Sequence, residues 1–304
     1  MSEYLPVRSS HVLLLKDVSL FHQPTDGEFV LYKREGSVLD QFWAKDPGLP
    51  DLFIRAGDRD SALEEMTASM NGGIRESIAA GGLNQVKDTL CRIVDEALTP
   101  GQEKVMDALP ETIEILLDAY EEDRRALDYL TRIAAKSRVM VEHSVNVTAL
   151  VLQFCLFHGM DRSRTKWMGL GALIHDVGTV EIDKAIIEKK ERLTEKEFKI
   201  YSGHTLFGHE IIVQTTNFNE LVSRIALEHH ERIDGSGYPH QTRDIAYESQ
   251  VIGLIDSYES LTYWTKEFRK RKKPFDSLSL IKDETLGGKF SKKIFKQFTS
   301  CLIR

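Results

Sequence analysis

The sequence predicts a mainly α-helical protein with a small α+β region at its N-terminus. Short β-like runs separated by turn-forming residues occupy the chain up to about residue 57, which favours a small sheet there. From about residue 83 onward, apolar residues recur at helical spacing. The length of 304 residues is that of about two domains, and the change of pattern indicates that the second domain is helical.

The predicted strands are apolar runs rich in residues that favour extended backbone. They cover residues 12–15, 29–32 and 52–55. Pro, Asp and Gly at residues 24–27 and 46–48 predict turns between them. The N-terminal region is therefore expected to form a small sheet.

Two helices are predicted after this sheet. The first begins at Asp60 or Ser61 and runs to Met70, where the Asn-Gly-Gly of residues 71–73 is expected to interrupt it. The second covers residues 86–97, with its apolar side chains at helical spacing. We interpret residues 1–110 as a small α+β domain that has a regulatory or partner-binding role, since no motif in it indicates a ligand.

Residues 111–136 are predicted to form a helical connector to the C-terminal domain, residues 137–304. Apolar residues recur at helical spacing from Ile113 to Ala134, and residues 121–125 place a run of charges on the other face. Such a run is typical of a solvated helix face. The alternative is a helix through which the protein forms an oligomer.

Composition and charge restrict the class of protein. The net charge of −7 argues against binding to nucleic-acid polymers, which requires a basic face. Three cysteines form no even framework, which favours a reducing compartment. The N-terminus lacks the pattern of a signal peptide, and the most apolar window, residues 149–157, is too short to span a bilayer. These features predict a cytoplasmic protein without a transmembrane segment.

The segment HHERIDGSGYP, residues 229–239, contains the strongest candidate site. His229 and His230 are adjacent, and a largely neutral imidazole is a good metal ligand. Gly235 and Gly237 predict a tight turn, and Pro239 fixes the backbone at its exit. A rigid loop is therefore expected directly after a pair of metal ligands.

Three further side chains of this segment have expected roles in the loop. Asp234 is predicted to hydrogen-bond the turn, and Glu231 to orient a ligand histidine as an outer carboxylate. Tyr238 is predicted to pack within the loop; the alternative is that it presents a surface to a protein partner.

Other candidate ligands lie on predicted helices or at their ends. They are His143, His175, Asp176, His204 and Asp256. A carboxylate beside a histidine can bridge two metal ions while the histidine binds one of them. Two divalent ions can clamp a phosphodiester between them. Helices whose ligands all face one core can assemble such a site.

With these residues the chain resembles the HD-GYP branch of the HD superfamily of metal-dependent phosphohydrolases, over roughly residues 130–262. The resemblance includes Gly178 after His175-Asp176, Gly208 after His204, and the whole HHERIDGSGYP segment. It implies an all-helical HD-type C-terminal domain. It also implies that the protein hydrolyses cyclic di-GMP to pGpG or on to GMP.

The resemblance further implies a binuclear metal site. The first metal would take His143, His175, Asp176 and Asp256, and the second would take His204, His229 and His230, with Asp176 bridging and thus catalytic. A hydroxide between the ions would be the nucleophile. The family favours iron and then manganese, and a donor set of imidazole and carboxylate also suits zinc or nickel.

The chain departs from the family near this site. Thr179 stands where the family usually has a lysine, so a catalytic cation is replaced by a hydroxyl. Val139 occupies the position of a glutamate that helps some members hold a third metal, so we expect two ions. Lys184 is a nearby candidate cation for the substrate. The alternative function is a catalytically weakened receptor for cyclic di-GMP, or a protein-interaction module.

The segment after Asp256 also differs, with Glu259 and then a basic run over residues 266–273. This run is interpreted as a solvated surface; alternatively, Arg269 and Arg271 attract and bind the anionic dinucleotide. A third hypothesis retains hydrolysis but assigns another cyclic dinucleotide, or a nucleotide, as substrate.

Overall fold

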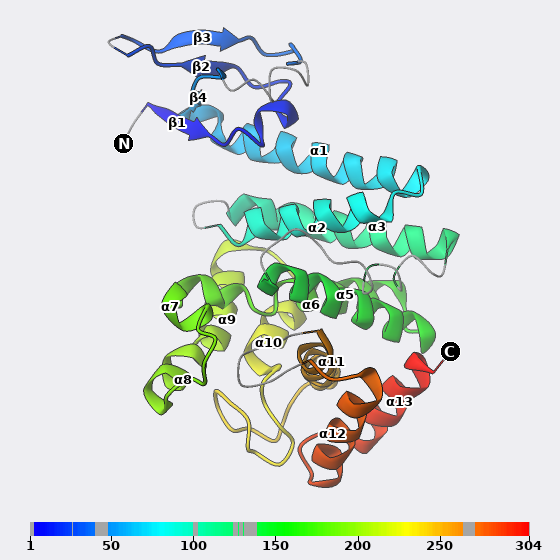
Figure 1. Cartoon of the computed structure of the whole chain (residues 1–304). Helices are drawn as coiled ribbons and strands as arrows, with labels where there is room; N and C mark the ends of the chain where they lie inside the picture. The colour runs from blue at the N-terminus through cyan, green and yellow to red at the C-terminus, as the bar shows by residue number, and fades with distance from the viewer. Residues whose placement is uncertain are drawn as a thin grey trace.

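The computed structural model describes residues 3–25, 27–39, 48–99, 103–123, 127, 130, 139–263 and 271–303. The elements are stacked in layers (Figure 1). A small sheet lies at one end, α1 (Arg59–Ala79) lies under it, and α2 (Leu83–Ala97) and α3 (Leu109–Glu122) form the next layer. The remaining helices continue the stack to the C-terminus. The mainly helical fold with a small N-terminal α+β part agrees with the prediction.

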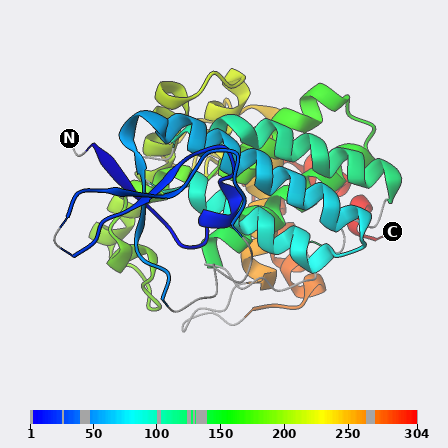
Figure 2. The same ribbon diagram turned by 90° about the horizontal axis from the view of Figure 1, so that it is seen from above.

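The sheet is antiparallel, with strand order β1-β4-β2-β3. Its strands are β1 (Tyr4–Val7), β2 (Leu20–His22), β3 (Val30–Lys33) and β4 (Leu52–Arg55). Viewed from above, the sheet covers one end of α1, and the rest of that helix extends beyond it (Figure 2).

The predicted strand at residues 12–15 is wrong. Val12–Leu14 forms a 3-10 turn, η1, in which the Leu14 amide donates to the His11 carbonyl. Val12 and Leu15 bury their side chains as η1 packs against α1. The apolar run therefore covers a helix instead of pairing in the sheet. Residues 46 and 47 of the second predicted turn lie outside the described residues.

The predicted interruption at residues 71–73 is also wrong. α1 begins directly after a 3-10 turn, η3 (Ala56–Asp58), and continues through residues 71–73 to Ala79. Asn71 is buried, and its amide oxygen accepts a 2.8 Å hydrogen bond from the Thr112 hydroxyl of α3. This partner satisfies a side chain that would otherwise compete with the helix backbone.

The predicted helical connector, residues 111–136, includes most of α3. Of the residues after α3 in this segment, most lie outside the described ranges. α3 follows the 3-10 turn η4 (Glu103–Ala108) and packs against α6 (Arg162–Ile174). Arg162 of α6 reaches across to Glu114 and Glu121 of α3. Oligomer formation through residues 111–136 stays a prediction.

The secondary-structure elements among the described residues of the C-terminal part are all helical, and loops connect them. Its elements are α5 (Val139–Phe157), α6 (Arg162–Ile174), η5 (Val177–Glu181), α7 (Lys184–Ile187), α8 (Glu195–Tyr201), α9 (His204–Thr215), α10 (Glu220–Glu228), α11 (Tyr247–Tyr263), α12 (Pro274–Leu286) and α13 (Lys292–Leu302). Side-chain caps begin several of them: Asp161 accepts from the Arg164 amide at α6, and Asn219 accepts from the Leu221 amide at α10.

α5 is the central helix of this part, with α2, α6, α11 and α13 packed around it. By length and composition its segment Met140–Phe157 could cross a bilayer, but 72% of that segment is buried inside the protein. Such burial is typical of the core helix of a soluble protein.

A single apolar cluster runs from the sheet through α1, α2 and α3 to α10, and a second one joins α5 and α6 to α11, α12 and α13. The first cluster crosses residue 110 without a break. The division of the chain at residues 110 and 136 stays a prediction.

Candidate metal centre

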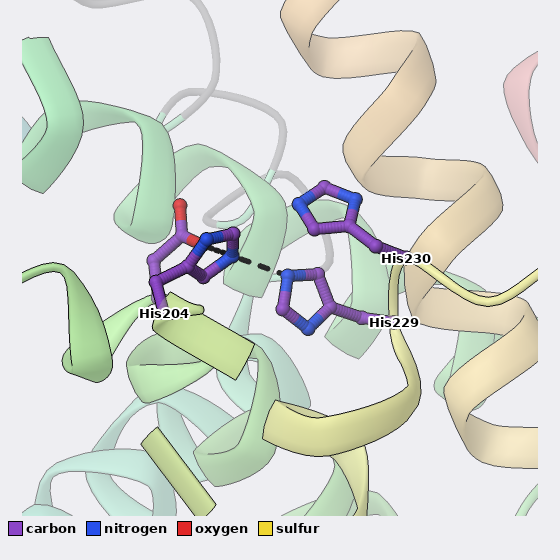
Figure 3. Close-up of side chains that lie close together, drawn as sticks. His204, His229 and His230 are labelled. Carbon is purple, nitrogen blue, oxygen red and sulfur yellow. Dashed lines mark ion pairs between the residues drawn. The ribbon is translucent and has the colours of Figure 1, made fainter. Parts of the chain in front are cut away.

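Seven side chains predicted as metal ligands converge at one place. They lie within helices or directly beside helix ends: His143 in α5, His175 and Asp176 after α6, His204 at the start of α9, His229 and His230 after α10, and Asp256 in α11. In Figure 3 the rings of His204, His229 and His230 turn toward a shared space. The ends of α6, α9 and α10 therefore meet side chains from within α5 and α11 at this place.

The side chains form two groups, in each of which the potential ligand atoms lie within 4.8 Å of one another. One group contains Asp176, His204, His229 and His230, and the other contains His143, His175 and Asp256. Within the second group, His143 Nε2 lies 3.1 Å from Asp256 Oδ1.

Asp176 lies between the two groups. Its Oδ1 is 3.3 Å from His204 Nε2 and 3.6 Å from His229 Nε2. Its Oδ2 is 3.4 Å from His175 Nε2. One carboxylate thus presents an oxygen to each group, which is the arrangement that a bridging ligand requires.

The polar atoms at the centre have the character of a metal site. His175 Nε2, His204 Nε2, His229 Nε2 and Asp176 Oδ1 are buried without a hydrogen-bond partner among the described residues. Buried polar atoms normally find partners. The Nδ1 atoms of these three rings face backbone carbonyls, of Ala172, Tyr201 and Ala226 respectively, which leaves Nε2 with a free lone pair. These residues therefore fit divalent cations.

Electrostatics favours anionic carboxylates here. Burial alone raises the pKa of Asp176, but the neighbouring imidazoles of His175, His204 and His229 outweigh it, so the pKa lies well below its usual range. Burial also opposes ionisation of Asp256, whose pKa is nevertheless lowered by His143.

The histidines divide into two kinds. Burial, with the neighbouring His229, holds the pKa of His230 well below its usual value. For His143, burial also lowers the pKa, but Glu259 and Asp256 raise it more strongly, well above its usual value. The centre therefore combines neutral imidazoles with rings held by carboxylates.

Two glycines allow the backbone segments around the centre to approach. A Cβ on Gly178 would lie 2.0 Å from the carbonyl oxygen of His204, and a Cβ on Gly237 would lie 2.4 Å from Glu231 Cα. Side-chain rearrangement could not relieve either clash, because both neighbours are backbone atoms. Gly178 thus lets the turn of Asp176 pack on α9, and Gly237 lets the loop fold back on the histidine pair.

The loop after the histidine pair is held by its own polar groups. Asp234 Oδ1 accepts a 2.8 Å hydrogen bond from the Ser236 amide, and Gly235 has a φ of 82°. Glu231 Oε1 accepts from the His240 amide at 2.6 Å, so this carboxylate closes the loop. Among the described contacts it orients no ligand histidine. Pro239 follows a cis peptide bond.

Tyr238 lies against the centre, with its ring centroid 4.7 Å from that of His230. It lines a cavity of about 580 Å³ together with Phe198, Tyr201, Arg232 and Lys289. The cavity also reaches His143, Asp176, His230 and Asp256. A space of this size suits a small-molecule ligand.

The other predicted substrate residues lie elsewhere. Thr179 is buried in η5, and its hydroxyl donates to the Asp176 carbonyl at 2.7 Å. Lys184 at the start of α7 and Arg271 are exposed, and neither is among the residues that line the cavity. Arg269, like most of the basic run and the side chain of Val139, lies outside the described residues.

Sequence reasoning missed three residues that shape the site. Arg232 stacks over Phe290 at 4.6 Å and donates to the His229 carbonyl at 3.1 Å. Glu259 is fully buried and pairs with His143 Nδ1. Lys289 supplies a second cation to the cavity wall. Spacing could have indicated Glu259, which lies three residues after Asp256 on one helix face.

Comparison with known proteins identifies the helical part. A family model described as HD domain matches residues 128–291, which is more than half of the chain. A solved HDG"Y"P protein of Bdellovibrio bacteriovorus has a TM-score of 0.60 at 16% identity, covering 99% of this chain and 100% of that one. The shared fold therefore includes the N-terminal part.

Curated relatives match about half of the chain. A protein named cyclic di-GMP phosphodiesterase from Pseudomonas aeruginosa is 27% identical over 180 residues, which cover 58% of this chain and 42% of that protein. Another of that name, from Borreliella burgdorferi, is 32% identical over 160 residues, or 51% and 40% of the two chains. A 3′3′-cGAMP-specific phosphodiesterase of Vibrio cholerae is 27% identical over 175 residues, or 56% and 37%. The chain thus spans about two fifths of the length of these relatives.

Proposed function

Because the chain belongs to the HD domain family and carries the residues of its HD-GYP branch, we propose that it is a metal-dependent cyclic dinucleotide phosphodiesterase. Cyclic di-GMP is the proposed substrate, and pGpG or GMP the product. The observation that carries this proposal is the convergence of seven ligand side chains, several with buried polar atoms that lack a partner among the described residues, beside a cavity that four of them line.

The proposed ligand sets follow the two groups of side chains. His143, His175 and Asp256 would hold one ion, His204, His229 and His230 the other, and Asp176 would contact both. The resemblance to the HD-GYP branch favours iron and then manganese, and the donor set of imidazole and carboxylate also suits zinc or nickel. Bound divalent ions would supply Lewis acidity, which lowers the pKa of water and neutralises charge on a phosphate.

The protein's own cavity residues would bind and orient the dinucleotide. Arg232 and Lys289 provide positive charge for its phosphates, in place of the lysine that Thr179 replaces. Tyr238, Phe198 and Tyr201 offer aromatic faces on which a base can stack. The carboxylates of Asp176 and Asp256 face the same space. Without a metal ion to neutralise their charge, they would repel a phosphate. Substrate binding is therefore expected to require the metal.

Metal analysis combined with a product assay tests this proposal. We expect two divalent ions per chain, formation of pGpG or GMP from cyclic di-GMP, loss of activity on chelation, and recovery on adding Mn²⁺. A panel containing 3′3′-cGAMP and cyclic di-AMP would identify the preferred dinucleotide. His230→Ala is expected to abolish turnover.

A receptor function is the second candidate, and Thr179 is the observation that favours it. Its hydroxyl is engaged with the Asp176 backbone, so the usual catalytic cation has no direct substitute at that position. If the metal-loaded protein binds cyclic di-GMP but leaves it intact through long incubation, hydrolysis is wrong and the receptor function is favoured. The receptor function would involve a protein partner that contacts the loop at residues 229–239 or the N-terminal part. For the phosphodiesterase function we propose a cytoplasmic location.

A further inference from the structure

Lys87 is a lysine of α2 with no exposed surface. A fully buried amine is rare unless it is paired. Its Nζ donates to Glu142 Oε1 at 2.9 Å and to Asn146 Oδ1 at 2.8 Å, both on α5. Since α2 lies before the region matched by the HD family model, a residue of the N-terminal part enters the helical core.

The hydrogen bonds continue from Asn146 to the candidate metal centre. Asn146 Nδ2 donates to Glu259 Oε1 at 2.7 Å, and Glu259 Oε2 pairs with His143 Nδ1. Asn146 is 2% exposed and Glu259 is fully buried, so water does not compete for these bonds. The chain Lys87–Asn146–Glu259–His143 thus joins three helices.

The direction of the bonds in this chain is set by its two charged members, Lys87 and Glu259. An ammonium group has only donors, so Asn146 must turn its oxygen toward Lys87 and its NH₂ toward Glu259. A carboxylate only accepts, so His143 must donate from Nδ1. His143 Nε2 then faces Asp256 Oδ1, 3.1 Å away, where a metal ligand is needed.

We propose that Lys87 is a positioning residue for the metal centre, holding the ring of His143 through Asn146 and Glu259. This inference rests on the proposed metal site. Without Lys87, the Asn146 amide oxygen loses its hydrogen-bond donor, and the amide is held only by its bond to the Glu259 carboxylate, so both side chains are positioned less firmly behind His143. The orientation of α2 is thereby coupled to one metal ligand.

Titration of the metal-free full-length protein with Mn²⁺ tests this inference, with hydrolysis of cyclic di-GMP measured separately. Lys87→Met is expected to weaken one of the two metal equilibria by about tenfold, in the range seen for groups behind a ligand. The other equilibrium, assigned to His204, His229 and His230, should stay unchanged. Lys166→Met is the matched control, because Lys166 of α6 also joins two helices. Its Nζ lies 3.0 Å from Glu114 Oε1 of α3, and this pair is remote from the metal centre.

Asn146→Ala is the second variant, because it breaks the chain but keeps the Lys87–Glu142 ion pair. It should weaken the same equilibrium, and the double variant should be no weaker than Asn146→Ala alone. If Lys87→Met lowers thermal stability but leaves both metal equilibria unchanged, Lys87 has only a structural role in its ion pair with Glu142, and the inference is overturned. Absence of Mn²⁺ binding in the wild type would overturn it as well. Metal binding without hydrolysis would contradict only the proposed activity.

Discussion

At the scale of single residues, Thr179 holds the turn that presents Asp176 to the metal centre. Its hydroxyl donates to the Asp176 carbonyl at 2.7 Å, and the residue is buried. The Thr179 amide donates to the same oxygen at 3.0 Å. Both hydrogen bonds stay within the turn, so the side chain acts on the position of Asp176 and has no direct access to the cavity.

Thr179→Val is therefore expected to lower stability and leave substrate affinity unchanged. The substitution keeps the shape of the side chain and removes one hydrogen bond, at a cost of about 1 kcal/mol. Thermal unfolding and KM for cyclic di-GMP measure the two effects. Thr165→Val is the control, since Thr165 makes the same kind of bond at the start of α6, to Asp161. A raised KM with unchanged stability would assign Thr179 to the substrate.

Four candidate ligands could be identified from the sequence because they stand in adjacent pairs, whereas His143, His204 and Asp256 were identified through the resemblance to the HD-GYP branch. His175-Asp176 and His229-His230 are neighbours in the chain, and a local pattern therefore reveals them. Lys87 and Glu142 are 55 residues apart, and nothing near Lys87 indicates a buried partner. Residues that act on the site through other side chains depend on how the helices pack, which spacing alone does not specify.

At the scale of elements, the approach of the Asp176 turn to α9 depends on Gly178. A Cβ there would lie 2.0 Å from the His204 carbonyl and 2.3 Å from the Gly208 amide nitrogen. Gly178→Ala is expected to destabilise the protein by roughly 2 kcal/mol, since rigid backbone must move. It should also weaken metal binding by His204. Thermal unfolding and metal stoichiometry measure these effects.

Gly72→Ala provides the control for Gly178→Ala. Gly72 lies in α1, and a Cβ there would meet no atom within 4 Å. Alanine favours a helix interior over glycine, so this variant should gain about 0.5–1 kcal/mol. Equal effects of the two substitutions would refute the importance of the close approach at Gly178.

Elements were predicted well where periodicity is long and poorly where tertiary contacts decide. The helical spacing after residue 83 predicted α2 and the helical part correctly. The Asn-Gly-Gly of residues 71–73 read as an interruption because its partner, Thr112 of α3, is remote in sequence. Strand β1 was missed because Pro6 interrupts its apolar run, and β2 was missed because it has only three residues.

At the scale of the whole molecule, Glu96 of α2 ties down the segment after β1. Its Oε1 atom lies 2.7 Å from Arg8 Nη1 and 2.8 Å from His11 Nε2. Burial alone raises the pKa of Glu96, but the hydrogen bonds and charges of His11 and Arg8 outweigh it and hold the pKa below its usual value. A lowered folded pKa stabilises the fold above the unfolded value, and the effect is lost as pH falls through the folded value.

Glu96→Gln is thus expected to lower the melting temperature at pH 7 and to flatten its decline below about pH 4.5. Melting temperature against pH measures both. Glu111→Gln is the control, since its pair with Arg75 is half exposed and contributes little. An unchanged acid limb in Glu96→Gln would show that this carboxylate does not link the segments.

The N-terminal part is expected to be required for folding of the helical part. Residues of α2 and α3 share one buried cluster with α5, α6 and α10, and Lys87 bonds to two side chains of α5. Removing residues 1–110 would expose that apolar surface and leave Glu142 and Asn146 without their cation. Since burial of apolar surface is the main driving force of folding, residues 111–304 alone should aggregate or lose cooperative unfolding. Size-exclusion chromatography and thermal unfolding against the full chain measure this, and a soluble, cooperative fragment of equal stability would instead identify an independently folding domain.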